Sequence, residues 1–340
     1  MHLGRRYRLS ELLIWTRRET AYIFAWSLFA TVLLEVLHWH FLSTPAPLLA
    51  IVGTAVAIVV AFKNQQCFSR ANEALASWEQ IAVTSLIWAS KLRIAASHLD
   101  AGQPGLPLKE LFDRHVAWLT ALRFYLREGR TWENAHERGN ARFLAEDPTP
   151  ESKSVLKDEL AACLSETELQ KVMAHRGDRE ALILSWQYQT VGDLRGKGLI
   201  NDSIFFMLTN ALDDLVRLQG ATKRIKNYPY ARNYYSITVL LVKAFVAIVP
   251  FALFPYFRDL GTPSGVGHWT AWLNVPFSLL VGWIFVTLEK VGENSSNPFE
   301  GGSNDVPISS IARRIEIEMR TALGETTDLK PIEAKDSILF

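Results

Sequence analysis

The stretch that decides the fold is residues 48–62, LLAIVGTAVAIVVAF, which carries no charge and runs directly into the polar sequence KNQQCFSR at 63–70. A helix rises about 1.5 Å per residue, so this run is slightly short for the ~30 Å hydrocarbon core of a membrane. We therefore expect the helix to continue past Phe62. A second apolar run precedes it at 21–42, and a proline-containing turn at 43–47 separates the two. The pair predicts a membrane hairpin.

Two further apolar runs occur late in the chain, at 235–254 and 269–288. Pro276 lies inside the second of them and predicts a kink, because proline cannot donate the backbone hydrogen bond of a helix. Together the four runs predict an all-α, polytopic membrane protein with four transmembrane helices and a cytosolic helical bundle.

The middle of the chain is polar and lacks the alternation of β-strands. Apolar residues recur three and four apart in it, which is typical of helices, at 71–99, 108–126 and 200–225. The polar residues 127–176 predict a loop, and residues 308–323 predict an amphipathic helix. The expected parts are a cytosolic N-terminal segment (1–19), the membrane hairpin (20–62), a cytosolic helical region (63–234), the last two membrane helices (235–288) and a cytosolic C-terminal loop and helix (289–340).

Charge sets the expected orientation. Arginines cluster before the first run and basic residues before the third, whereas the loops that follow these runs are nearly free of them. By the positive-inside rule both termini are cytoplasmic, in a bacterial inner membrane. The net charge of +1 argues against a nucleic-acid partner, and two cysteines argue against a disulfide framework. No nucleotide loop, metal motif or nucleophile motif occurs, so we expect no enzyme activity, no cofactor and no metal site.

The helix at 48–62 has two faces of interest. Thr54, Ile58 and Phe62 are four residues apart and share one face. The neighbouring face has only small residues, Gly53, Ala57 and Ala61, which allow close helix packing. In a single chain the stripe means ordinary contact with lipid or another helix. In a symmetric ring it would form stacked rings of Thr, Ile and Phe around an axis, and such hydrophobic constrictions gate pores.

Two ionisable residues lie inside the predicted spans, Glu35 in the first and Lys243 in the third. Charged side chains are costly in hydrocarbon and usually pair, face protein or line water. We expect Glu35 and Lys243 to pair, either as a structural tie or as a functional one.

Three motifs resemble those of the bestrophin family, and of its bacterial branch in particular. The turn Phe62-Lys63-Asn64 resembles the end of the second bestrophin helix, and the segment at 224–229 (RIKNYP) resembles the approach to the third. The most specific match is the signature loop, whose residues here are Asn297, Pro298, Phe299, Asn304, Asp305 and Pro307. The motifs stand in the family's order, so the resemblance covers nearly the whole chain.

The resemblance implies a homopentameric ion channel whose central pore passes monovalent ions, by family habit anions such as chloride. Its partners would be copies of itself, membrane lipid and the permeant ions. Matching the helix end places Thr54, Ile58 and Phe62 at the hydrophobic neck. A second, cytosolic constriction would fall at Ser203 or Ile204. Two charges near the pore, Lys63 and Asp202, would pull ion selectivity in opposite directions, so a cation channel of the same fold remains an alternative.

The sequence also departs from the family. Thr54 replaces the usual aliphatic residue, and Ala71-Asn72 replaces a pair of tryptophans. The loop at 300–305 has too few carboxylates for the calcium cage of animal members, and we interpret it as a tight turn before the helix at 308. A membrane-anchored binding or sensor protein is the alternative from another class, and it predicts monomers or dimers.

Overall fold

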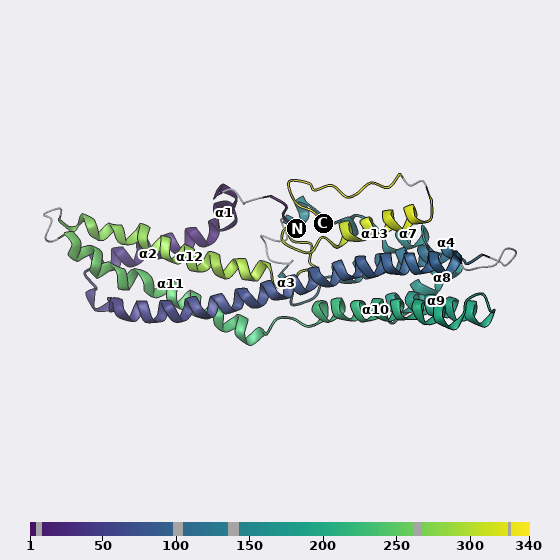
Figure 1. The fold of residues 1–340 in the computed structure, drawn as a ribbon. Helices are drawn as coiled ribbons and strands as arrows, with labels where there is room; N and C mark the ends of the chain where they lie inside the picture. Colours follow the sequence, from purple (N-terminus) through teal and green to yellow (C-terminus); the bar gives the residue numbers. More distant parts are fainter. Residues whose placement is uncertain (5–8, 98–104, 135–142, 262–266, 326–327) are drawn as a thin grey trace. The chain divides into compact units, whose positions relative to one another are not determined.

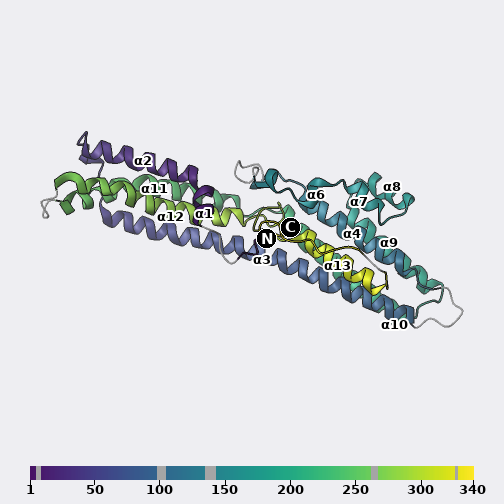
Figure 2. The same ribbon diagram turned by 90° about the horizontal axis from the view of Figure 1, so that it is seen from above.

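The computed structural model describes residues 1–4, 9–97, 105–134, 143–261, 267–325 and 328–340. In this part of the chain the regular elements are helices, and β-pairing is limited to two isolated bridges. The predicted all-helical fold class is therefore confirmed for the described residues. The chain forms two compact units, whose helices are labelled in Figures 1 and 2, and each unit is described by itself.

The first unit, called the apolar unit, contains Gly4–Ser69 and Tyr230–Ser296. Its helices are α1 (Leu9–Trp15), α2 (Arg17–Glu35), the first part of α3 (Ala46–Ser97), α11 (Arg232–Gly261) and α12 (Asn274–Asn294), with 3-10 turns η1 (His40–Leu42) and η3 (Gly267–Leu273). Three segments are long and apolar enough to cross a membrane: His40–Ser97, Arg232–Leu260 and Trp269–Asn294.

The predicted first span is shorter than expected. The apolar run continues to residue 42, but α2 ends at Glu35 and η1 follows after a break. His38 lies at this break with a φ of 55°, a left-handed conformation that interrupts a helix. The indole of Trp26 donates to the carbonyl of Ala247 at 3.0 Å and ties α2 to α11.

The prolines act differently from the prediction. Pro276 is the third residue of α12, in the first helical turn, where a missing N–H costs nothing, so it does not kink the helix. The internal prolines belong to α11 instead, at Pro250 and Pro255. Pro255 cannot donate to the carbonyl of Phe251, and the backbone N–H of Thr44 does so at 3.2 Å.

Helix α3 confirms that the decisive apolar run continues into polar sequence, because it extends unbroken from Ala46 to Ser97. Between Gly53 and Ser97 the sequence contains no proline and no further glycine, so no residue breaks the helix. Its first part belongs to the apolar unit and its part from Arg70 onward belongs to the second unit.

The second unit, called the polar unit, contains Met1–Leu3, Arg70–Pro229 and Asn297–Phe340. Besides α3, its helices are α4 (Leu108–Arg127), α6 (Pro150–Lys153), α7 (Leu156–Ala161), α8 (Glu166–Ala174), α9 (Arg179–Gly196), α10 (Asp202–Asn227) and α13 (Ile308–Ala322). They enclose one large apolar core, in which three tryptophans are fully buried, Trp78, Trp88 and Trp118.

The predicted loop at 127–176 is wrong where the structure describes it, because α6, α7 and α8 lie there; residues 135–142 of it fall outside the described part. The start of α8 shows why short polar helices form. Ser165 and Glu168 make a capping box, which satisfies backbone N–H groups of the first turn. By contrast, α13 begins at the predicted residue, Ile308.

Candidate functional site

The stripe predicted on α3 lies on the open surface of the apolar unit. Ile58 is 51% exposed, Phe62 is 62% exposed, and Thr54 is exposed as well. The hydroxyl of Thr54 donates to the carbonyl of Ala50 at 2.8 Å, so it is satisfied within the helix. Three apolar or weakly polar side chains at four-residue spacing therefore form an unpartnered row along one face.

The opposite face of α3 fixes this orientation. Val56 and Val60 are buried against Val242, Phe245 and Val249 of α11. Burial of apolar side chains stabilises a fold by about 25 cal/mol for each Å² removed from water, or less where the alternative is lipid. The helix thus turns its valines into the unit and its Thr54–Ile58–Phe62 stripe away from it.

The three residues of the predicted small-residue face lie in two different environments. Gly53 packs against α11, where a Cβ atom would come within 3.0 Å of the Phe245 ring. Ala57 and Ala61 are exposed beside the stripe. Glycine at position 53 therefore serves packing within the chain, and the two alanines leave room for a neighbour.

Lys63, the positive charge predicted near the pore, lies inside the apolar unit. Its side chain is 0% exposed and forms an ion pair with Glu289 of α12. The ammonium also lies 4.2 Å from the centre of the Tyr235 ring, within the range of a cation–π interaction. A buried and paired ammonium offers no free charge to an ion.

The two residues of the predicted cytosolic constriction differ in how far their side chains are exposed. Ile204 is 9% exposed and packs in the core of the polar unit. Ser203, one residue earlier in the first turn of α10, is exposed. Asp202 pairs with Arg195 at 2.8 Å, so its charge is compensated within the chain.

The pairing of Glu35 with Lys243 stays a prediction. Glu35 is the last residue of α2 and is half-buried, whereas Lys243 lies on the exposed side of α11. The ion pairs that the apolar unit does show include Lys63–Glu289 and Lys290–Glu19. A helix that ends at residue 35, earlier than the apolar run, moves Glu35 to a helix end.

The signature loop forms a tight turn in the polar unit. This is the interpretation that we preferred to a calcium site from the sequence. The carboxylate of Asp305 accepts the backbone N–H groups of Gly301 at 2.7 Å and Gly302 at 2.9 Å. Gly301 has a φ of 98°, which side chains rarely adopt. The N–H of Val306 donates to the carbonyl of Pro298 at 3.0 Å and closes the turn.

Three other residues of the signature, Asn297, Phe299 and Pro307, support this turn. Phe299 is buried in the core of the unit, and Pro307 lies directly before α13. The side chain of Asn297 donates to the carboxylate of Glu300, which also accepts the backbone N–H of Asn134 at 2.8 Å. In the described part of the chain no group of three His, Cys, Asp or Glu side chains is placed to hold a metal ion.

Glu300 is a buried carboxyl that sequence reasoning did not single out. Burial, together with the charges of Asp305 and Glu133, raises its pKa to about 8, although the hydrogen bonds from Asn134 and Asn297 act in the opposite direction. Glu133 in turn forms a buried ion pair with Lys226, whose own pKa is lowered by burial.

The raised pKa of Glu300 predicts that the polar unit loses stability as the pH rises. Between about pH 4.5, its ordinary pKa, and about pH 8 the folded state holds the proton more tightly than the unfolded state. The loss is at most about 1.4 kcal/mol for each pH unit in this window. Thermal melting at several pH values measures it, and Glu300→Gln should flatten the dependence; an unchanged slope in that variant would contradict the assignment.

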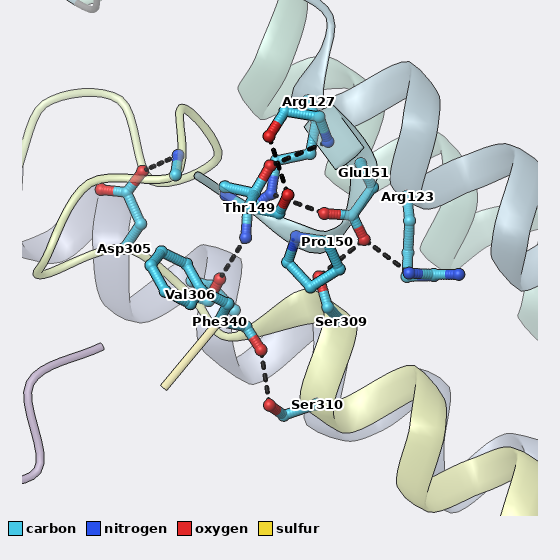
Figure 3. A network of polar contacts seen from close by, with 12 residues as sticks. Arg123, Arg127, Thr149, Pro150, Glu151, Asp305, Val306, Ser309, Ser310 and Phe340 are labelled. Atoms are coloured by element: carbon cyan, nitrogen blue, oxygen red, sulfur yellow. Dashed lines mark hydrogen bonds and ion pairs between the residues drawn. The ribbon is translucent and has the colours of Figure 1, made fainter. Parts of the chain in front are cut away.

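A polar network beside the loop was also missed by sequence reasoning (Figure 3). Glu151 accepts the guanidinium of Arg123 and the hydroxyl of Ser309, the latter at 2.6 Å, and lies 3.6 Å from Nε of Arg127. Although burial raises the pKa of Glu151, Arg127 and Arg123 hold it below its ordinary value. The network joins α4, α6 and α13, because its members come from these three helices.

The fold and the apolar helices define a membrane protein of all-helical architecture. A family model described as Bacterial/Fungal Bestrophin protein matches residues 10–321, so the chain belongs to the bestrophin family. The recognition made from the motifs is thereby confirmed.

Relatives of the chain occur in several bacteria. A protein of Salmonella typhi named voltage-dependent anion channel-forming protein YneE is 27% identical over 84% of this chain and 78% of its own length. A protein of Ralstonia nicotianae with the same description, RSc3414, is 24% identical over 81% of this chain and 76% of its own. The crystal structure of a bacterial bestrophin homolog from Klebsiella pneumoniae covers 91% of this chain and 98% of that chain with a TM-score of 0.72 and 20% identity, which shows a shared fold.

Proposed function

We propose that the chain is one subunit of a homopentameric channel that passes monovalent anions such as chloride through a bacterial inner membrane. The preference for anions over cations rests on the relatives, which are named anion channel-forming proteins. Passive conduction requires no chemistry, in keeping with a transport role and no enzyme activity.

The observation that carries the proposal is the exposed stripe of α3. A helix that buries its valines and leaves Ile58 and Phe62 open has an apolar row available to other copies of the chain. Around a five-fold axis the stripe gives stacked rings of Thr54, Ile58 and Phe62, a hydrophobic neck that ions cross only when it is wetted. Ser203 is the exposed candidate for the cytosolic constriction.

The proposed topology has four membrane crossings, with α2 added to the three apolar segments. Its 19 residues span about 28 Å as a helix, close to the thickness of the hydrocarbon core. Asn274 of α12 donates to the hydroxyl of Thr31 at 2.9 Å, which ties α2 to its neighbours by a buried hydrogen bond. Both termini and the polar unit are then cytoplasmic, and the outer faces of the apolar unit contact lipid.

The size of the protein in detergent tests this proposal against the membrane-anchored sensor. A channel of this family should have five times the mass of one chain after the mass of bound detergent is subtracted, as measured by light scattering. A monomer or dimer at concentrations that preserve the fold would contradict the ring and favour the sensor.

A further inference from the structure

The residue that follows Phe62 is a buried lysine with two partners in the apolar unit. Lys63 is fully buried, pairs with Glu289 of α12, and lies over the ring of Tyr235 of α11. We propose that Lys63 is a positioning residue: its buried ion pair fixes the rotation of α3 and so keeps Phe62 in the neck. This inference rests on the proposed pore function, and it identifies the residue that positions the Phe62 ring of the neck.

Helix geometry links the two residues directly. Successive side chains of an α-helix point about 100° apart, so a rotation that moves Lys63 moves Phe62 by the same angle. Lys63 therefore cannot leave Glu289 by rotation of α3 without turning the Phe62 ring. Because Phe62 is exposed and makes the edge of an unpartnered row, packing within the chain does little to hold it.

Further contacts secure α3 at the same level. The amide of Asn64 donates to the carbonyl of Leu288 at 2.8 Å, and the hydroxyl of Tyr234 donates to the carbonyl of Val59 at 3.2 Å. Helix α12 approaches closely here, since a Cβ atom at Gly292 would lie 2.0 Å from Oδ1 of Asn64. These contacts lie within about one helical turn of Phe62.

Lys63 is paired with Glu289, and a second carboxylate, that of Glu293, lies near enough to feel its charge. Glu293, one turn after Glu289, accepts the hydroxyl of Tyr235, and Lys290 between them is paired with Glu19. Apolar contacts such as Val56 against α11 are non-directional and tolerate small rotations, whereas a buried ion pair selects one register. The pair thus adds the rotational specificity that apolar packing lacks.

The test records single-channel currents of the full-length protein in planar bilayers. Four variants, Lys63→Met, Glu289→Gln, the double variant and Lys63→Arg, are compared in the wild-type and Phe62→Ala backgrounds. We expect Lys63→Met and Glu289→Gln each to change the open probability at least about fivefold, the lower end of coupling between two sites. Lys63→Arg, which keeps the charge, should behave as the wild type. In the Phe62→Ala background Lys63→Met should have no further effect, because the ring that it positions is absent.

Several results would overturn the inference. One is an open probability of Lys63→Met equal to that of the wild type, and another is an effect that persists in full without Phe62. If Lys63→Met fails to assemble, the double variant, which leaves no unpaired buried charge, is judged by the same two criteria. Absence of current from both the wild type and Phe62→Ala would overturn the pore function itself and this inference with it.

Discussion

Replacement of Phe62 by alanine should raise the single-channel conductance about tenfold, which corresponds to ~1.4 kcal/mol off the barrier to ion passage. The side chain is 62% exposed at the end of the stripe, so five copies around the proposed axis would form a ring of phenylalanines. Truncation to a methyl group widens that ring and removes the apolar surface that expels water from it. Ile58→Ala, one turn away, should raise the conductance in the same direction. Planar-bilayer recordings at fixed salt measure both.

Phe68 supplies the matched control for this prediction. It is a second exposed phenylalanine of α3, six residues later and therefore about 120° around the helix from Phe62. Phe68→Ala removes the same chemical group from the same helix and should leave the conductance at the wild-type value. A conductance of Phe62→Ala that does not exceed that of Phe68→Ala would place the stripe outside the pore.

Replacement of Glu151 by alanine should destabilise the polar unit by about 3–5 kcal/mol, because it leaves buried charges without a partner. Glu151 is buried between the guanidinium groups of Arg123 and Arg127 and also accepts the hydroxyl of Ser309. A loss of this size lowers the melting temperature by roughly 6–20 °C. Thermal unfolding in detergent, followed by circular dichroism, measures the shift.

An exposed ion pair of the same unit shows what burial contributes. Arg314 and Glu79 are joined at 2.8 Å, but both side chains are 49% exposed. Such pairs contribute ~0–1 kcal/mol, so Glu79→Ala should shift the melting temperature little. Equal shifts for Glu151→Ala and Glu79→Ala would show that the network of Figure 3 is not a stabilising centre.

The sequence predicted well those features that repeat along one helix. The continuation of α3 past Phe62 follows from a run without proline or further glycine, and the position of Ile58 and Phe62 on one face follows from four-residue spacing. The start of α13 at Ile308 follows from its amphipathic pattern after Pro307. These features depend on neighbours within a few residues, which is why one sequence suffices.

Features that depend on distant partners were missed. Lys63 looked like a free charge because Glu289 is 226 positions away, and no local pattern links the two. Helix α9 escaped prediction because its buried residues include Glu180 and Gln187, which obscure the apolar period. Ser203 and Ile204 are neighbours in the sequence. Only the packing of the polar unit decides that the first side chain is exposed and that the second lies in the core.

The most direct test of the central claim is the reversal potential of the purified protein in a planar bilayer under a tenfold potassium chloride gradient. The account predicts a current that reverses near the chloride equilibrium potential. The same reversal potential should hold for Phe62→Ala at higher conductance, because a hydrophobic ring limits the flow of ions without carrying a charge. A reversal near the potassium potential would contradict anion conduction while keeping the pore. No current from either protein would contradict the channel.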